Sequence, residues 1–153
     1  MIRYTTSLDG IVADDLRGGF WVGWPEPPSP DQHLASLRGS EAVVLAIDES
    51  GGAGDGSAGG RLVVGFVNAA GDGVLASSIP FLEVLPAWQG RGIGSELVHR
   101  IVAALSPRYM IDLTCDEDLI PFYERLGFQP HRAMIRRDRT ALTGLSGRET
   151  STP

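Results

Sequence analysis

The residues best suited to chemistry are three alternating glycines, Gly90, Gly92 and Gly94, which follow a strand-like run that ends at Pro86. A helix that begins there has backbone N–H groups without intrahelical partners in its first turn. These groups and the positive end of the helix dipole suit a pyrophosphate, and glycine allows a ligand to approach the backbone closely. Arg91 can add a positive charge. The pattern favours an anion site over a glycine turn that only packs a helix on a sheet.

The alternative use of such glycines is the dinucleotide-binding fingerprint, Gly-x-Gly-x-x-Gly with an acidic residue about 20 positions further on. Asp112 stands near that distance, but Ser95 occupies the place of the third glycine, which comes one residue early. Only about 60 residues follow, too few for the further strand–helix units of that fold. The sequence therefore disfavours a dinucleotide site.

All 13 basic residues of the chain are arginines. The absence of lysine excludes a phosphate-loop lysine, a kinase strand lysine and a lysine Schiff base. Residues 1–131 contain 17 acidic residues against 8 Arg, whereas residues 132–153 contain 5 Arg against 2 acidic residues. The acidic body disfavours nucleic acid as a partner and mildly favours cationic small molecules, while the Arg-rich end is interpreted as a solvated tail.

The 153 residues fit one domain, and 42% apolar with 21% charged residues is close to the globular average. The one cysteine, Cys115, cannot form an internal disulfide or a multi-thiolate zinc site, so we expect a reducing, cytoplasmic location. The histidines show no metal-ligand spacing, and no metal is expected. No apolar run approaches about 20 residues and the first residues do not resemble a signal peptide, so no membrane partner is expected.

Apolar and alternating runs predict an antiparallel first half of the chain. Ser29 and Gln32 form a capping box for a helix that ends near Arg38. Pro80 cannot donate to a strand ladder, so the last strand of this half is expected to splay from a neighbour there. Strands are expected over 2–6, 41–48, 61–69 and 74–85, with a helical turn over 13–17 and a flexible loop over 50–60.

The second half of the chain predicts a strand–helix–strand unit. Apolar residues at helical spacing indicate an amphipathic helix over 90–105, followed by a strand over 109–115. A short helix with Asp118 as its cap ends at Gly127, and a last strand is expected over 128–136. The right-handed crossover of this unit implies one parallel pair in a mostly antiparallel sheet.

Two separate blocks of the sequence resemble the GNAT acyltransferase superfamily. Its acyl-CoA signature, Gln/Arg-x-x-Gly-x-Gly/Ala, is matched by Gln89, Gly92 and Gly94. The second block, residues 113–128, contains Phe-Tyr-x-x-x-Gly-Phe and is similar to the matching segment of arylalkylamine (serotonin) N-acetyltransferases. The order of the expected strands and helices along residues 2–136 fits the same family.

The resemblance implies an α/β (α+β) fold with a mixed, mostly antiparallel sheet of about six strands, flanked by about four helices. Two parallel central strands would splay apart, which fits the proline inside the fourth expected strand. Residues 1–138 would form a single acyltransferase domain, and residues 139–153 a polar, flexible tail. Relatives of this family are often dimers, so a homodimer is an open expectation.

The resemblance also implies a site for coenzyme A. Backbone groups of Leu82 and Val84 would bond the pantetheine arm. Tyr123 would protonate the departing thiolate, because a phenol can donate at neutral pH; the alternative is a core aromatic whose hydroxyl reaches the surface. The backbone N–H groups that would hold the pyrophosphate belong to Gln89, Gly90, Arg91, Gly92, Ile93, Gly94 and Ser95.

The positions at which several relatives have a Glu or a pair of His offer no base here, because residues 77–80 are Ser, Ser, Ile and Pro. An amine with a pKa of about 10 must lose a proton before it attacks a thioester. Glu83, the only ionisable residue of this strand, is the candidate base; a water chain or the capture of free amine is the alternative. Asp116 stands where relatives often have Asn, and it is interpreted as a turn cap.

The resemblance thus implies an acetyl-CoA-dependent N-acetyltransferase that transfers acetyl directly to a primary amine. Trp21 and Trp24 lie in the segment that varies on the acceptor side, where they either line a substrate pocket or pin the loop to the core. The acidic body and these aromatic residues favour a small-molecule amine. A protein lysine or N-terminal acetyltransferase, and an acyl-CoA-binding sensor without turnover, are the alternatives.

Overall fold

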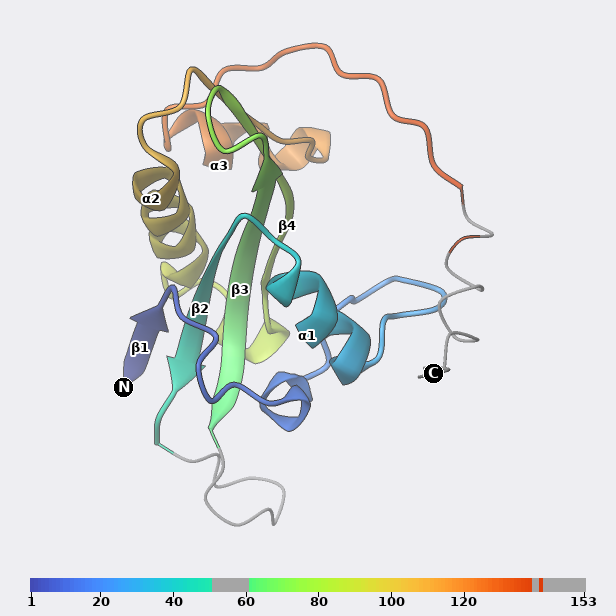
Figure 1. Cartoon of the computed structure of the whole chain (residues 1–153), viewed down its shortest axis with the longest axis vertical. Helices are drawn as coiled ribbons and strands as arrows, with labels where there is room; N and C mark the ends of the chain where they lie inside the picture. The colour runs from blue at the N-terminus through green and yellow to red at the C-terminus, as the bar shows by residue number, and fades with distance from the viewer. Residues whose placement is uncertain (51–60, 139–140, 142–153) are drawn as a thin grey trace.

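The computed structural model describes residues 1–50, 61–138 and 141 (Figure 1). The strands form one sheet in the order β1-β2-β3-β4-β5, antiparallel except for the parallel pair β4–β5, which confirms the predicted meander and parallel pair. The loop predicted over 50–60 and the tail predicted over 139–153 lie almost wholly outside the described residues. The strands are β1 (Ile2–Thr5), β2 (Ala42–Asp48), β3 (Leu62–Gly71), β4 (Ala76–Val84) and β5 (Met110–Asp112).

α-Helices and short 3-10 helices connect the strands. The cap of the first helix forms as predicted, since Ser29 Oγ accepts the Gln32 N–H at 3.2 Å and Gln32 Oε1 accepts the Ser29 N–H at 2.9 Å. The cap predicted at Asp118 is wrong, because that residue lies inside a 3-10 turn that precedes the last helix. The α-helices are α1 (Pro30–Arg38), α2 (Ile93–Leu105) and α3 (Ile120–Glu124), and the 3-10 helices span Ala13–Leu16, Pro86–Trp88 and Glu117–Leu119.

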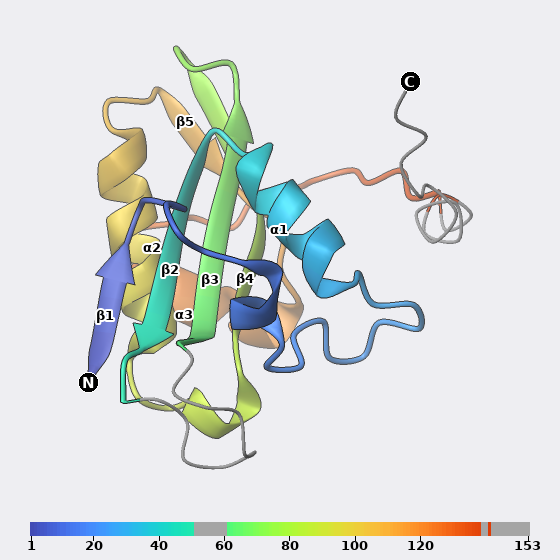
Figure 2. The ribbon, with the colours of Figure 1, turned by 60° about the horizontal axis from the view of Figure 1, so that its bottom comes forward.

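Helices cover both faces of the sheet (Figure 2). α2 packs on β2, β3 and β4. It approaches β3 so closely that a Cβ at Gly65 would lie 3.1 Å from Leu97 and 3.3 Å from Ile93. On the other face, the ring of His33 on α1 lies 4.3 Å from that of Phe66. Because successive residues of a strand point to opposite faces, β3 separates two apolar layers and is buried along most of its length.

In its described part the chain has five strands and three α-helices, fewer than the expected counts of about six and about four. Residues 128–136 run extended but pair with no described strand (Figures 1 and 2). Met134 in this segment is fully exposed. Pro130 lies in this segment and cannot donate to a strand ladder, which disfavours pairing with the edge of β5. The turn predicted over 13–17 forms as a 3-10 helix rather than as a fourth α-helix.

The splay predicted at Pro80 is confirmed. β4 pairs with β5 only as far as Ser78, whereas its pairing with β3 continues to the end of the strand. The register with β3 shifts here, so that Ile79 and Pro80 together stand opposite Ala69. A residue without an N–H fits such an unpaired edge. From Ile79 onward, the side of β4 that would face β5 is therefore open.

Candidate active site

A tight turn joins β4 to α2 and places the glycine segment at this open edge. Gly90 and Gly92 have φ of +73° and +78°, a backbone conformation that strains residues with a side chain. Gly92 is also the residue that precedes the first turn of α2. A Cβ at either glycine would meet no atom within 4 Å. The two glycines therefore leave the backbone of the turn uncovered.

The main feature of the turn is its set of unpartnered N–H groups. None of the six from Gly90 to Ser95 donates to an acceptor in the described part of the chain, whereas the next, that of Glu96, donates to a carbonyl of the turn at 3.1 Å. Consecutive N–H groups at a helix start suit phosphate oxygens. The predicted seventh donor differs, because the Gln89 N–H donates to the Pro86 carbonyl at 3.3 Å. The open set therefore begins at Gly90.

Two side chains brace the turn. Gln89 Nε2 donates to the Val84 carbonyl at 3.0 Å and ties the turn to the end of β4. The guanidinium of Arg91 lies 4.8 Å from the centroid of the Trp88 ring and donates to the Ala87 carbonyl at 2.9 Å. Arg91 is exposed beside the open N–H groups, where its charge can attract an anion.

The edge of β4 offers further open backbone groups. The Leu85 N–H donates to the Val64 carbonyl of β3 at 2.9 Å. Since successive strand residues direct their N–H and C=O groups to opposite sides, those of Val84 and Leu82 point away from β3. The Val84 carbonyl agrees with this, because it accepts the Gln89 side chain instead. Leu82 thus presents its N–H and C=O to the open edge beside the glycine turn, whereas Val84 presents its N–H, because its carbonyl already accepts the Gln89 side chain.

Tyr123 lies on α3, which reaches the start of α2. The ring of Phe122 is 3.6 Å from where a Cβ of Gly94 would stand. The Tyr123 ring contacts those of Phe122 and Phe128, with centroids 4.9 and 5.8 Å apart, and it lines a cleft of about 1070 Å³ between β5 and the segment that follows α3. Burial raises the pKa of Tyr123 to about 12. The phenol therefore stays protonated at neutral pH and can donate a hydrogen bond.

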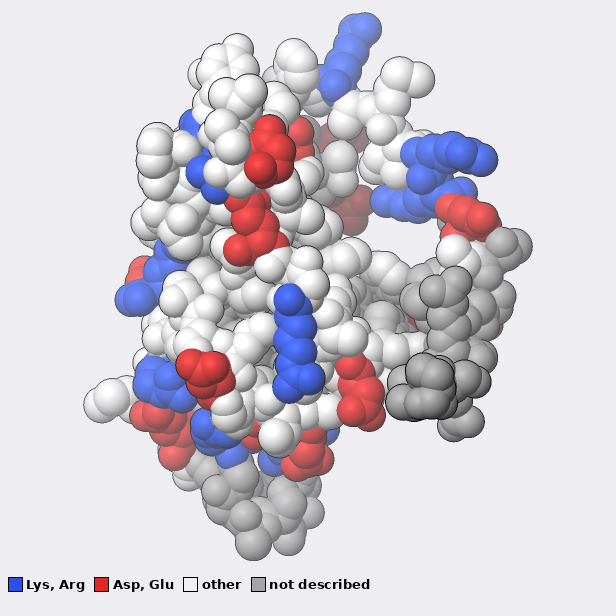
Figure 3. Space-filling view, viewed as in Figure 1, with Lys and Arg blue, Asp and Glu red and all other residues white. Residues whose placement is uncertain are grey.

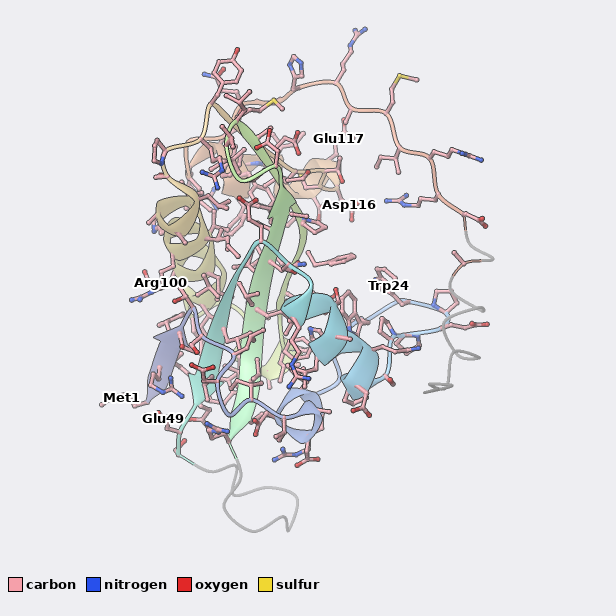
Figure 4. All side chains as sticks on the ribbon, in the orientation of Figure 1. Met1, Trp24, Glu49, Arg100, Asp116 and Glu117 are labelled. Carbon is pink, nitrogen blue, oxygen red and sulfur yellow. The ribbon has the colours of Figure 1, made fainter. Side chains whose placement is uncertain are left out.

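Cys115 and Asp116 precede α3 in the chain. Cys115 is exposed, and partial desolvation together with the charges of Asp116 and Asp118 raises the pKa of its thiol. A protonated thiol is a poor nucleophile. The Asp116 side chain makes no capping hydrogen bond, although the residue precedes a 3-10 turn. Figure 4 shows Asp116 beside Glu117, on the same side of the view as Trp24.

Glu83 is half-buried on the face of β4 opposite to that of Val84. Its Oε2 accepts the backbone N–H of Trp21 at 2.7 Å. Burial raises the pKa of Glu83, and the hydrogen bond from Trp21 acts in the opposite direction. A carboxylate with a raised pKa is a better base than a solvated one, which favours a chemical role over that of a solvated strand end.

An aromatic cluster surrounds Trp21, whose N–H donates to this carboxylate. Trp21 is 5% exposed, and its ring centroid lies 5.0 Å from that of Phe81, 5.2 Å from that of Trp24 and 4.9 Å from that of His33. Trp21 thus pins the loop to the core, which was the alternative to a place in the pocket wall. Trp24 is half-buried, and its ring centroid lies 6.0 Å from that of Phe81. Trp24 and Phe81 are therefore the aromatic residues available to an acceptor.

Phe81 and Phe122 belong to the site but were not among the predicted residues. Phe81 stands two positions before Glu83, so strand alternation alone places both side chains on one face, and this signal was present in the sequence. Nothing in the sequence indicates that Phe122 would contact Gly94. The hydrogen bond between Trp21 and Glu83 joins residues 62 positions apart and has no local signal.

His33 gives the cluster a pH-dependent stability. It is 1% exposed, and burial lowers its pKa to about 4. The unfolded chain binds this proton near pH 6.5 and the folded chain only near pH 4. The neutral, buried His33 therefore costs the folded chain no stability above about pH 6.5. As the pH falls toward 4, the unfolded chain takes up this proton first, and the free energy of unfolding decreases. We expect the free energy of unfolding to drop by about 2 kcal/mol between pH 7.5 and pH 5 because of this residue.

Urea unfolding of the wild type and of His33→Phe at these two pH values measures this contribution. The variant keeps an aromatic ring in the cluster but has no proton to bind, so it should lose that part of the pH dependence. An equal drop in both proteins would show that other groups cause it.

Within residues 1–50 and 61–138, no three His, Cys, Asp or Glu side chains stand together in a way that could hold a metal ion. No described helix is long and apolar enough to cross a bilayer. Figure 3 shows acidic and basic side chains mixed over the body and further basic side chains along the extended segment after α3. That segment contains Arg132, Arg136 and Arg137, in line with the charge asymmetry of the sequence.

Known proteins share this architecture. The model of the acetyltransferase (GNAT) domain family matches residues 40–130. GCN5-related N-acetyltransferase 2 of Arabidopsis thaliana is 32% identical over 119 residues, 71% of this chain and 46% of the relative. Serotonin N-acetyltransferase 2 of Oryza sativa is 35% identical over 136 residues, 88% of this chain and 63% of the relative. A crystal structure of a candidate acetyltransferase from Deinococcus radiodurans R1 has a TM-score of 0.79 at 43% identity and covers 89% of this chain and 87% of that one.

The family model covers more than half of the chain, so the chain belongs to the GNAT acetyltransferase family. It spans less than two thirds of the length of the two plant relatives. Other relatives are named for different acceptors: an aminoglycoside N(6')-acetyltransferase of Stenotrophomonas maltophilia (34% identity; 67% of this chain, 65% of the relative) and a histone acetyltransferase of Glycine max (32%; 71% and 47%). Membership of the family therefore does not identify the molecule that accepts the acetyl group.

Proposed function

We propose that the chain is an acetyl-CoA-dependent N-acetyltransferase that acetylates a primary amine of a small molecule. The observation that supports this most is the row of six N–H groups from Gly90 to Ser95, which have no acceptor among the described residues. The space above the glycines is open, so a diphosphate fits against the backbone there. The pantetheine arm would then follow the open edge at Val84 and Leu82, and its thioester would supply the acetyl group.

Glu83 is the proposed general base. It accepts one hydrogen bond through Oε2, and its raised pKa suits the removal of a proton from an ammonium group. The freed nitrogen attacks the carbonyl carbon of the thioester, so that a C–N bond forms and the C–S bond breaks. The electron pair of the C–S bond leaves with the sulfur as a thiolate, and the excess proton on the new amide nitrogen passes to the thiolate or to water, so that an amide and free CoA result.

Tyr123 is the proposed donor to that thiolate. Since its pKa of about 12 exceeds the value of about 8.5 for a thiol, Tyr123 acts mainly through a hydrogen bond to the charged sulfur. Such a bond contributes about 1.5 kcal/mol, or roughly tenfold in rate. Tyr123→Phe should therefore lower kcat about tenfold while the Kd of CoA changes little.

Steady-state kinetics and calorimetric titration of CoA measure these two quantities. Tyr109→Phe is the matched control, because Tyr109 is 91% exposed and is not among the residues that line the cleft beside Tyr123. A kcat of Tyr123→Phe equal to that of the control would remove Tyr123 from the mechanism.

The surroundings of Glu83 favour a small amine as the acceptor. Phe81 shares a face of β4 with Glu83 and its ring lies 6.0 Å from that of Trp24, so aromatic surface is available on this face, and the net charge of −6 attracts cations. The similarity to a serotonin N-acetyltransferase supports the same choice. A protein acceptor is the alternative, supported by the relative named a histone acetyltransferase.

Release of free thiol from acetyl-CoA, followed with arylalkyl amines, aliphatic amines, aminoglycosides and lysine peptides, tests the proposal. We expect turnover with at least one small amine and none with peptides. Turnover with peptides alone would make the protein acceptor correct. Thermal stabilisation by CoA without thiol release from any member of the panel would support a sensor and overturn the enzymatic proposal.

A further inference from the structure

Trp21 has a backbone conformation that tryptophan rarely adopts. Its φ is +71°, and it is the one residue other than glycine with a positive φ in the described part of the chain. A non-glycine residue in this region costs about 1–3 kcal/mol and persists only where its surroundings hold it there. Gly19 and Gly23, on either side in the same loop, have similar φ values of +82° and +84° without this cost.

The side chain of Trp21 accounts for this conformation. Its ring lies between the rings of Phe66 on β3 and Phe81 on β4, 5.5 and 5.0 Å away, and next to His33 on α1. The Trp24 N–H closes the loop by donating to the Trp21 carbonyl at 3.0 Å. Burial of a whole indole contributes enough apolar contact to offset the backbone strain.

The consequence of the strained backbone is the direction of one N–H group. It points at Glu83 and donates to Oε2 at 2.7 Å. No other hydrogen bond to this carboxylate comes from the described residues. A hydrogen bond to a charged acceptor restricts its rotation as well as stabilising it, so it leaves one carboxylate oxygen in a defined direction.

We propose that Trp21 is the positioning residue of the general base: its indole, packed among Phe66, Phe81 and His33, holds the backbone N–H that orients and stabilises the Glu83 carboxylate. The inference rests on the proposed function, in which Glu83 accepts the proton of the amine. It differs from a pocket-wall role, because the side chain acts through the backbone of its own residue and touches no substrate.

Few other charges act on this carboxylate. Phe66 of β3 stands opposite Glu83 in the sheet, and Phe81 of β4 shares its face. His33 of α1 is the titratable group of the aromatic cluster, and with its pKa near 4 it is neutral over the working range. Burial and the Trp21 N–H are the two influences on the pKa of Glu83, and they oppose each other. Removal of the N–H alone should therefore raise that pKa.

The sharpest test replaces the amide between Phe20 and Trp21 by an ester, with the α-hydroxy acid analogue of tryptophan at position 21. This change deletes one N–H and keeps the indole. We expect the acid limb of the pH profile of kcat/KM to move up by about one pH unit, while the rate well above that limb stays within about threefold of the wild type. The same ester at Gly23, whose N–H has no acceptor among the described residues, is the matched control.

A Trp21 ester with the pH profile of the wild type and of the Gly23 ester would overturn the proposal. Trp21→Phe and Trp21→Ala add a second test: the ring of Phe should retain most of the wild-type profile, whereas Ala should move the acid limb as the ester does. If the Ala variant fails to fold, the ester alone decides. If Glu83→Gln itself keeps the wild-type profile, Glu83 is not the base, and the proposed mechanism fails independently of Trp21.

Discussion

Glu83→Gln should lower kcat/KM for the amine about 100-fold at pH 7, the lower end of what a general base contributes. The amide oxygen of Gln can still accept the Trp21 N–H that Glu83 Oε2 accepts at 2.7 Å, so the loop should stay in place while the base is lost. The deficit should shrink as the pH rises toward the pKa of the amine, because a growing fraction of the amine is then already uncharged. The Kd of CoA should not change.

The matched control is Glu26→Gln, which changes an exposed carboxylate of the same loop. Rates measured from pH 6 to pH 9.5 for the three proteins separate a base from a merely structural carboxylate. A loss that is equal at every pH would indicate that Glu83 supports the loop, and deprotonation would then occur through water or by capture of free amine.

Gly92→Val should raise the Kd of CoA about 100-fold. The side chain would fill the open space above the turn and block the approach of the diphosphate to the N–H groups around it. Loss of one or two hydrogen bonds to a charged phosphate, each about 1.5–3 kcal/mol, gives an effect of this size. The substitution also strains the backbone, since φ is +78° at this residue, so a control for strain is required.

Gly73→Val provides that control. Gly73 lies in the turn between β3 and β4 and has φ of +76°, and a Cβ there, as at Gly92, would meet no atom within 4 Å apart from those of its chain neighbours. Both variants should lose similar stability in urea, but only Gly92→Val should lose CoA affinity. Equal, small changes in Kd for both would mean that the nucleotide does not bind at this turn.

The features of the fold and of the site that the sequence predicts are those that depend on residues close together in the chain. The capping box at Ser29, the helical spacing of α2 and the missing donor of Pro80 each act within a few residues, and each has the predicted effect. The glycine turn belongs to this class too, because the φ angles of Gly90 and Gly92 are local properties.

The parts that the sequence does not predict depend on contacts between distant segments. Trp21 reaches Glu83 across 62 positions, and only the packing of three aromatic rings explains its backbone. The strand expected over 128–136 does not form in the described structure, since strand propensity is realised only when a paired edge and a buried face are available. Local patterns indicate which residues are candidates, and tertiary packing decides how they are oriented.

The most direct test of the central claim follows the backbone amides of residues 90–95 by heteronuclear NMR during titration with CoA and, separately, with pantetheine, which lacks the diphosphate. If these N–H groups bind the diphosphate, CoA should shift the signals of Gly90, Gly92 and Gly94 more than those of the control Gly73, and pantetheine should leave them nearly unchanged. Binding of CoA without a shift at these residues, or equal shifts with pantetheine, would contradict the account.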